Sequence, residues 1–237
     1  MGKNSTGLFH SVQFFKKANL AQVKVCLEAG GKIDGHDEHG NSPLHWAAAL
    51  SPHPEVIDAL VNAGADPDCP NERGETPLHT AAAFNPNDRI IDALCTAGGD
   101  PHRRNEEKWT PLHAAAANSN KPAVIRTLLA VDADPNSVNN NFWTPLMIAV
   151  VYNRIEISAS SKHIKEGINP QHHDGGSLYS TDDFTFLPGG LASPHPQIIA
   201  DLIESGADVN HANLNKQTPL HAAAACNSSP DTIAALI

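Results

Sequence analysis

A pattern that recurs every 34 residues constrains the fold of this chain more than any other feature. The string Ser42-Pro43-Leu44-His45 returns three times at 34-residue intervals, with threonine in place of serine, and once more after a gap of 74 residues. We interpret the long gap as two repeats plus six extra residues. The copies begin at Ser42, Thr76, Thr110, Thr144 and Thr218. Fixed periods of roughly 20–50 residues are typical of solenoids, so the 237 residues predict a stack of about seven similar units.

Each unit has the pattern of two helices followed by a turn-rich connector. Serine or threonine followed by proline starts a helix, because the hydroxyl caps a free amide and proline occupies a position that needs no backbone donor. The apolar pair Val56-Ile57 begins a second helix with one apolar stripe, and Gly64 ends that helix in the left-handed conformation. The polar residues 66–75 predict a hairpin-like connector.

The unit resembles the ankyrin repeat, whose signature joins a T-P-L-H-x-A-A helix, an apolar second helix and a G-A-D-x-N hairpin. The usual ankyrin period is about 33 residues, one fewer than here. The resemblance implies an all-α, ankyrin-repeat solenoid of stacked helix-turn-helix units with hairpin connectors, forming a single domain over residues 1–237. The expected repeats are 8–41, 42–75, 76–109, 110–143, an irregular unit at 144–183, a degenerate unit at 184–217 and a truncated unit at 218–237. Because the last unit stops inside its second helix, we expect a fragment of a longer array.

Residues 147–191 depart from the pattern. Met147 replaces the motif histidine, and Pro188-Gly189-Gly190 falls where an inner helix should run. Glycine and proline in that number do not support a short helix. Two interpretations stay open for this segment: a recognition loop or hinge, and a decayed repeat that its well-formed neighbours tolerate.

Histidine is frequent, and the residues that could bind a metal or catalyse a reaction need separate consideration. The resemblance implies that the motif histidines hydrogen-bond within and between repeats; these are His45, His79, His113 and His221. Two other groups lack a partner motif that would supply three or four converging ligands: they are His36 with His39, and His163 with His172, His173 and Asp174. The chain has no H-E-x-x-H, phosphate loop, nucleophile elbow or C-x-x-C string. We therefore expect no metal, no cofactor and no enzymatic activity.

Charge and hydropathy limit the classes of partner. The formal net charge of −10 argues against binding to nucleic acid. No window approaches the ~20 apolar residues of a membrane span, and the first residues lack the apolar core of a secretory signal. We expect a cytoplasmic monomer, with an exported effector as the alternative location.

The resemblance implies that a partner binds in the concave groove, which hairpin tips and exposed positions of the first helices line. Trp109 and Trp143 are one repeat apart, so we expect them side by side along the hairpin row. Aromatic residues and arginine are common hot spots of protein interfaces. The prediction is an aromatic and basic patch; the alternative is that the tryptophans pack against the adjacent hairpin and stiffen the array. The candidate partner-binding residues are Trp46, Thr80, Arg103, Arg104, Lys108, Trp109, Phe142 and Trp143.

The expected function is a non-catalytic scaffold that binds another protein through the concave face and the hairpin tips. The alternative is that the array is the targeting or substrate-recognition portion of a larger enzyme or secreted effector. In that case the catalytic domain would lie outside this chain.

Overall fold

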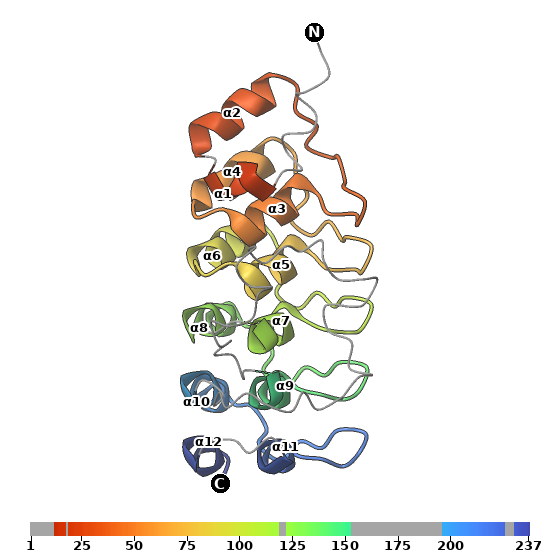
Figure 1. Ribbon diagram of the computed structural model, residues 1–237, viewed down its shortest axis with the longest axis vertical. Coiled ribbons are helices and arrows are strands. Elements are labelled where there is room, and N and C mark those ends of the chain that lie inside the picture. Colours follow the sequence, from red (N-terminus) through yellow and green to blue (C-terminus); the bar gives the residue numbers. More distant parts are fainter. Residues whose placement is uncertain (1–11, 18, 119–121, 153–195, 226–229) are drawn as a thin grey trace, which may run out of the picture.

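The structure is a computed structural model that describes residues 12–17, 19–118, 122–152, 196–225 and 230–237. Within these ranges the chain forms helices joined by turns, with no strand. The helices stack in two rows, and hairpin-like loops project from one side of the stack (Figure 1). The all-α solenoid that the sequence predicts is confirmed.

The two rows hold the first and the second helix of each unit, which we call the inner and the outer helices. The inner helices lie beside the hairpins, and each contacts the next along the stack (Figure 1). They are α1 (Val12–Lys17), α3 (Pro43–Leu50), α5 (Pro77–Phe84), α7 (Pro111–Asn118), α9 (Pro145–Tyr152) and α11 (Pro219–Ala225). The outer helices are α2 (Leu20–Glu28), α4 (Pro54–Asn62), α6 (Arg89–Thr96), α8 (Pro122–Ala130), α10 (Pro196–Glu204) and α12 (Pro230–Ala235).

Four of the inner helices, α3, α5, α7 and α11, begin with Pro-Leu-His and contain a run of alanines. In α5, Thr76 is the N-cap and Pro77 takes the first helical position, as the sequence predicts. Ala81 and Ala82 are buried against the neighbouring inner helices. Alanine has no side-chain entropy to lose and lets backbones approach closely, so this composition suits a tightly stacked row.

The outer helices are amphipathic, and their apolar stripe holds them to the stack. Four of them bury two adjacent β-branched residues and a leucine, and a fully buried aliphatic side chain contributes about 1.5–3 kcal/mol. The triplets are Val56, Ile57 and Leu60; Ile90, Ile91 and Leu94; Val124, Ile125 and Leu128; and Ile198, Ile199 and Leu202. Gly64 follows α4 with a φ of 103°, which confirms the predicted left-handed helix end.

The fifth unit differs from the division that the sequence suggested. Helix α10 contacts α9 and also α8, the outer helix of the preceding unit. The hairpins agree: the Asn136 side-chain amide donates to the Gly206 carbonyl at 2.8 Å, and the Asp208 backbone N–H donates to Asn136 Oδ1 at 2.7 Å. Helices α9 and α10 are therefore the inner and outer helices of one unit, and the prediction of separate repeats at 144–183 and 184–217 is wrong.

The error lies in how the 74-residue gap was divided. It is one repeat of 34 plus 40 further residues, and these fall between the two helices of the fifth unit. Residues 153–195 lie outside the described residues, and so does most of the irregular segment 147–191. The described units are 12–41, 42–75, 76–109, 110–143, 144–217 and 218–237.

Candidate partner-binding surface

A buried histidine connects the start of one inner helix to the start of the next. Nδ1 of His79 accepts the Thr76 backbone N–H at 3.1 Å, so the proton sits on Nε2. Nε2 then donates to the carbonyl oxygen of Trp109, 3.0 Å away and directly before the next N-cap. The pairs around His45 and His113 repeat this geometry. The role that the resemblance implied for these three histidines is confirmed.

These imidazoles belong to the scaffold and are held neutral. Burial lowers the pKa of His45, His79 and His113 to about 4, although the carbonyl contact on Nε2 acts in the opposite direction. Both ring nitrogens already have partners within the fold. Met147 holds this position in the fifth unit and has no N–H to donate, so that unit lacks the connection.

The two tryptophans of the predicted patch are buried. Trp109 is 1% exposed and Trp143 is 6% exposed, and both belong to the hydrophobic core. The Trp109 ring lies 5.7 Å from the imidazole of His113. The carbonyl oxygen of Trp109 accepts the N–H of His79, and that of Trp143 accepts the N–H of His113. Both residues therefore lie at the base of a hairpin. Their side chains pack into the hydrophobic core. The exposed aromatic pair expected from the sequence is therefore not present, and burial supports the packing alternative.

The other members of the predicted patch are exposed along the hairpins. Arg103 pairs across hairpins with Asp68 at 3.5 Å, and Arg104 Nη1 donates to the Val138 carbonyl at 3.5 Å. Lys108 is exposed, and Phe142 is 48% exposed. These four residues leave a basic and aromatic surface at the hairpins, without the tryptophans.

An asparagine organises each hairpin tip, and the sequence reasoning missed it. Oδ1 of Asn105 accepts the backbone N–H groups of Glu107 and Trp109 at 3.0 and 2.8 Å. Equivalent bonds are made by Asn71, Asn139 and Asn213, with Asp37 in the first hairpin. An asparagine five residues before the motif threonine, at 71, 105, 139 and 213, is the signal that could have revealed this turn.

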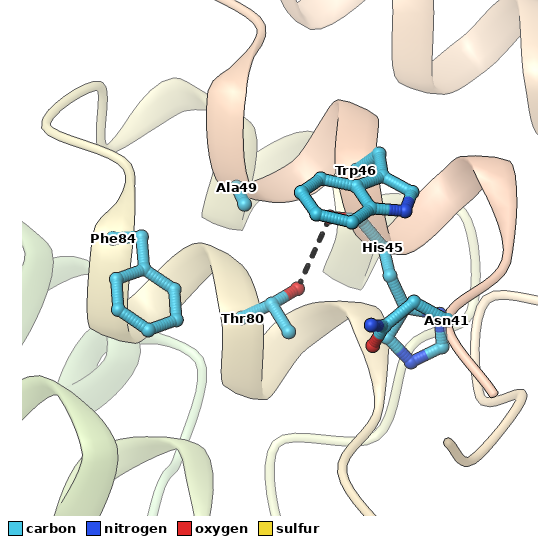
Figure 2. Close-up of a pocket in the computed structure, with 6 residues that line it drawn as sticks. All are labelled: Asn41, His45, Trp46, Ala49, Thr80 and Phe84. Carbon is cyan, nitrogen blue, oxygen red and sulfur yellow. Dashed lines mark hydrogen bonds between the residues drawn. The ribbon is translucent and has the colours of Figure 1, made fainter. Parts of the chain in front are cut away.

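A small apolar pocket opens between α3 and α5. Its volume is about 30 Å³, room for one methyl group or one water molecule. Figure 2 shows Thr80 between Trp46 and Phe84, and the Thr80 hydroxyl donates to the His45 carbonyl at 3.3 Å. Trp46 and Thr80, both predicted to bind a partner, are only 3% and 8% exposed, so they form walls of the pocket. The lining residues are Asn41, His45, Trp46, Ala49, Thr80 and Phe84.

The described residues contain no group of three or more His, Cys, Asp or Glu that could hold a metal ion. His36 Nδ1 lies 3.1 Å from the Gly40 carbonyl oxygen, and His39 lies 3.8 Å from the carboxylate of Glu38. The other histidine group, at 163 and 172–174, lies outside the described residues. In the same described part of the chain, no helix is long and apolar enough to cross a membrane.

Family models for ankyrin repeats match most of the chain. One for ankyrin repeats in three copies matches residues 78–159, and one for ankyrin repeats in many copies matches residues 44–97 and 191–237. The chain belongs to the ankyrin repeat family. The match from residue 191 includes α10, in agreement with its place as an ankyrin outer helix. No curated protein matches this ankyrin chain. Ankyrin repeats generally serve as protein-interaction modules and are typically non-catalytic.

Proposed function

We propose that this ankyrin domain is a non-catalytic scaffold that binds a partner protein on the side formed by the inner helices and the hairpins. The observation that carries the proposal is the apolar pocket between α3 and α5, which is lined by residues of these two inner helices and by Asn41 of the first hairpin. The outer helices α4, α6 and α8 instead present charged side chains to solvent: Glu55, Asp58, Arg89, Asp92 and Arg126.

The pocket suits one methyl group at the end of a partner's aliphatic side chain. Its walls come from Trp46 and Phe84, and Trp46 is fixed because its Nε1–H donates to Asp37 Oδ2 at 3.0 Å. A pocket with fixed walls loses little conformational entropy when it is filled, which favours binding. Asn41 and Thr80 complete the lining, and their polar side-chain atoms already hydrogen-bond within the fold.

Site-specific photo-crosslinking tests this orientation. A photoreactive phenylalanine analogue replaces Phe84 in one variant and Thr96, exposed on the outer helix of the same unit, in the matched control. In the native cell, we expect a discrete crosslinked protein from position 84 and none from position 96. Crosslinking from position 96 alone, or none from either position, would overturn the proposal.

A further inference from the structure

Three exposed side chains occupy a backbone position that suits glycine. Lys108, Phe142 and Lys216 have φ values of 60°, 59° and 59°, and Gly40 and Gly74 hold the same position in the first two hairpins. L-amino acids disfavour this left-handed conformation, whereas glycine adopts it freely. Non-glycine residues in this conformation are concentrated at binding and switch sites. We call Lys108, Phe142 and Lys216 the tip row.

The members of the tip row lie on successive, connected hairpins. The Asn140 backbone N–H donates to the Glu107 carbonyl at 3.1 Å, which joins the tip that carries Lys108 to the tip that carries Phe142. The carbonyl of Phe142 in turn lies 3.1 Å from Nε2 of His211 on the following hairpin. Figure 1 shows these hairpins following one another along one side of the stack, so the tip row is a continuous edge.

Glu106 and Glu107 directly precede Lys108, but the two later hairpins of this edge lack acidic residues. Residues 135–143 and 209–217 contain no Asp or Glu, although the chain has a net charge of −10. Among the described residues, no salt bridge involves Lys108 or Lys216. In the first three hairpins, the residue two positions before the left-handed residue is a glutamate: Glu38, Glu72 and Glu106. In the fourth and fifth hairpins the same position holds Asn140 and Leu214.

Apolar surface accompanies the two lysines. Phe142 is 48% exposed, and Leu214, on the next hairpin, is 62% exposed. Exposed ion pairs contribute little affinity by themselves, but they select partners and steer their approach. An exposed aromatic side chain between two cations can therefore anchor a partner, and the cations favour a partner that is negatively charged on either side of that anchor.

We propose that the tip row binds an acidic segment of the partner protein, with its carboxylates on Lys108 and Lys216 and an apolar side chain on Phe142 and Leu214. The inference rests on the proposed function, because it names the chemistry of the partner. Glu38, Glu72 and Glu106 disfavour an acidic segment at the first three tips, so the segment lies along the hairpins of the fourth and fifth units and reaches Lys108 at one end.

Peptide binding to the full chain tests the proposal. The probe is a short fluorescein-labelled peptide of Asp and Glu with a central Leu-Phe pair; one matched peptide has Lys for the acids and another has Ala-Ala for Leu-Phe. We expect the acidic apolar peptide to bind at least tenfold more tightly than either, with affinity falling as salt rises. The double variant Lys108→Gly/Lys216→Gly and the single variant Phe142→Gly should each weaken binding at least tenfold without lowering the unfolding midpoint.

The control variant Lys16→Gln/Lys17→Gln removes the same charge from exposed positions of α1 and should bind like the parent. Equal loss in this control, no preference for the acidic peptide, or unchanged binding by the tip-row variants would overturn the inference. If position 84 crosslinks a partner but the chain shows no preference for the acidic peptide, the inference about the tip row is rejected and the scaffold proposal stands. Absence of both signals would reject the scaffold proposal as well.

Discussion

At the residue scale, the motif histidine stabilises the stack only while it is neutral. Its Nδ1 accepts a backbone N–H at an N-cap, and protonation would remove that acceptor and place a charge in a buried layer. Burial lowers the pKa of His45, His79 and His113 to about 4, whereas the ordinary value is 6.5. Because the folded pKa is depressed, this stability is fully present above pH 6.5 and is lost as the pH falls toward 4.

We therefore expect the free energy of unfolding to fall by about 2 kcal/mol for each of His45, His79 and His113 between pH 7 and pH 5. Urea titrations at the two pH values measure this loss. The variant His79→Gln should be less stable at pH 7, because it breaks the contact with Trp109. It should also lose about 2 kcal/mol less than the parent on acidification. An equal loss in both proteins would contradict the pH argument.

The two buried tryptophans stabilise the fold, and Phe142 does not. Trp109→Ala and Trp143→Ala each leave a large cavity in the core, so each should lower the free energy of unfolding by about 3–5 kcal/mol. Phe142→Ala changes an exposed side chain on the adjacent position and should stay within about 0.5 kcal/mol of the parent. Thermal and urea unfolding measure all three; a Trp143→Ala protein as stable as Phe142→Ala would show that the ring packs loosely.

At the element scale, each hairpin is a turn fixed by one asparagine or aspartate and one left-handed residue. The backbone N–H groups of the second and fourth residues after this side chain donate to its oxygen, and the residue between them has a positive φ. Neighbouring tips are also joined, since the Glu72 N–H donates to the His39 carbonyl at 3.1 Å. A Cβ added at Gly40 would lie 2.7 Å from that Glu72 nitrogen, so the first tip has no room for a side chain.

Gly40→Ala should therefore destabilise the chain by about 2 kcal/mol, from the strained φ and the contact with the Glu72 backbone. Gly74→Ala, where the closest backbone atom would be 3.1 Å away, should cost less. Lys108→Gly removes the same strain and should stabilise the chain by up to about 1 kcal/mol. Urea unfolding ranks the three variants, and a destabilised Lys108→Gly protein would mean that the lysine contributes to folding.

Local rules explain how much of these elements the sequence could predict. The helix starts at Thr76-Pro77 and the helix end at Gly64 follow from capping and backbone preference, which depend on adjacent residues. The burial of Trp109 depends on the hairpin and inner helices around it, which the pattern did not supply. The positive φ of Lys108 opposes local preference, so no propensity rule would have placed it there.

At the scale of the whole molecule, the stack is continuous through the fifth unit. Arg126 of α8 pairs at 3.2 Å with the buried carboxylate of Asp201 on α10, and Gln197 donates to the same carboxylate at 2.9 Å. The division of the 74-residue gap failed because two repeats plus six residues and one repeat plus 40 residues fit the motif spacing equally well. Ile198-Ile199 has the phase of an outer helix in either case, so only contacts with α8 and α9 distinguish the two.

This continuity predicts that residues 153–195 can be replaced by an ordinary turn. Helices α5 and α6 are joined by Asn85-Pro86-Asn87-Asp88, and the same four residues should join α9 to α10. A connection of four residues in place of 43 costs less closure entropy, and the gain by loop-closure scaling is about 2 kcal/mol. We expect one cooperative urea transition at a higher midpoint.

The same turn placed between α3 and α4, in place of residues 51–53, is the matched control for the graft itself. A shortened chain that unfolds in two steps, or at a lower midpoint than this control, would show that 153–195 contributes packing to the inner helices. Binding of the acidic peptide separates the two interpretations of the segment. Because the tip row lies wholly on described hairpins, a decayed repeat would leave its affinity unchanged, whereas a recognition loop would lower it on removal.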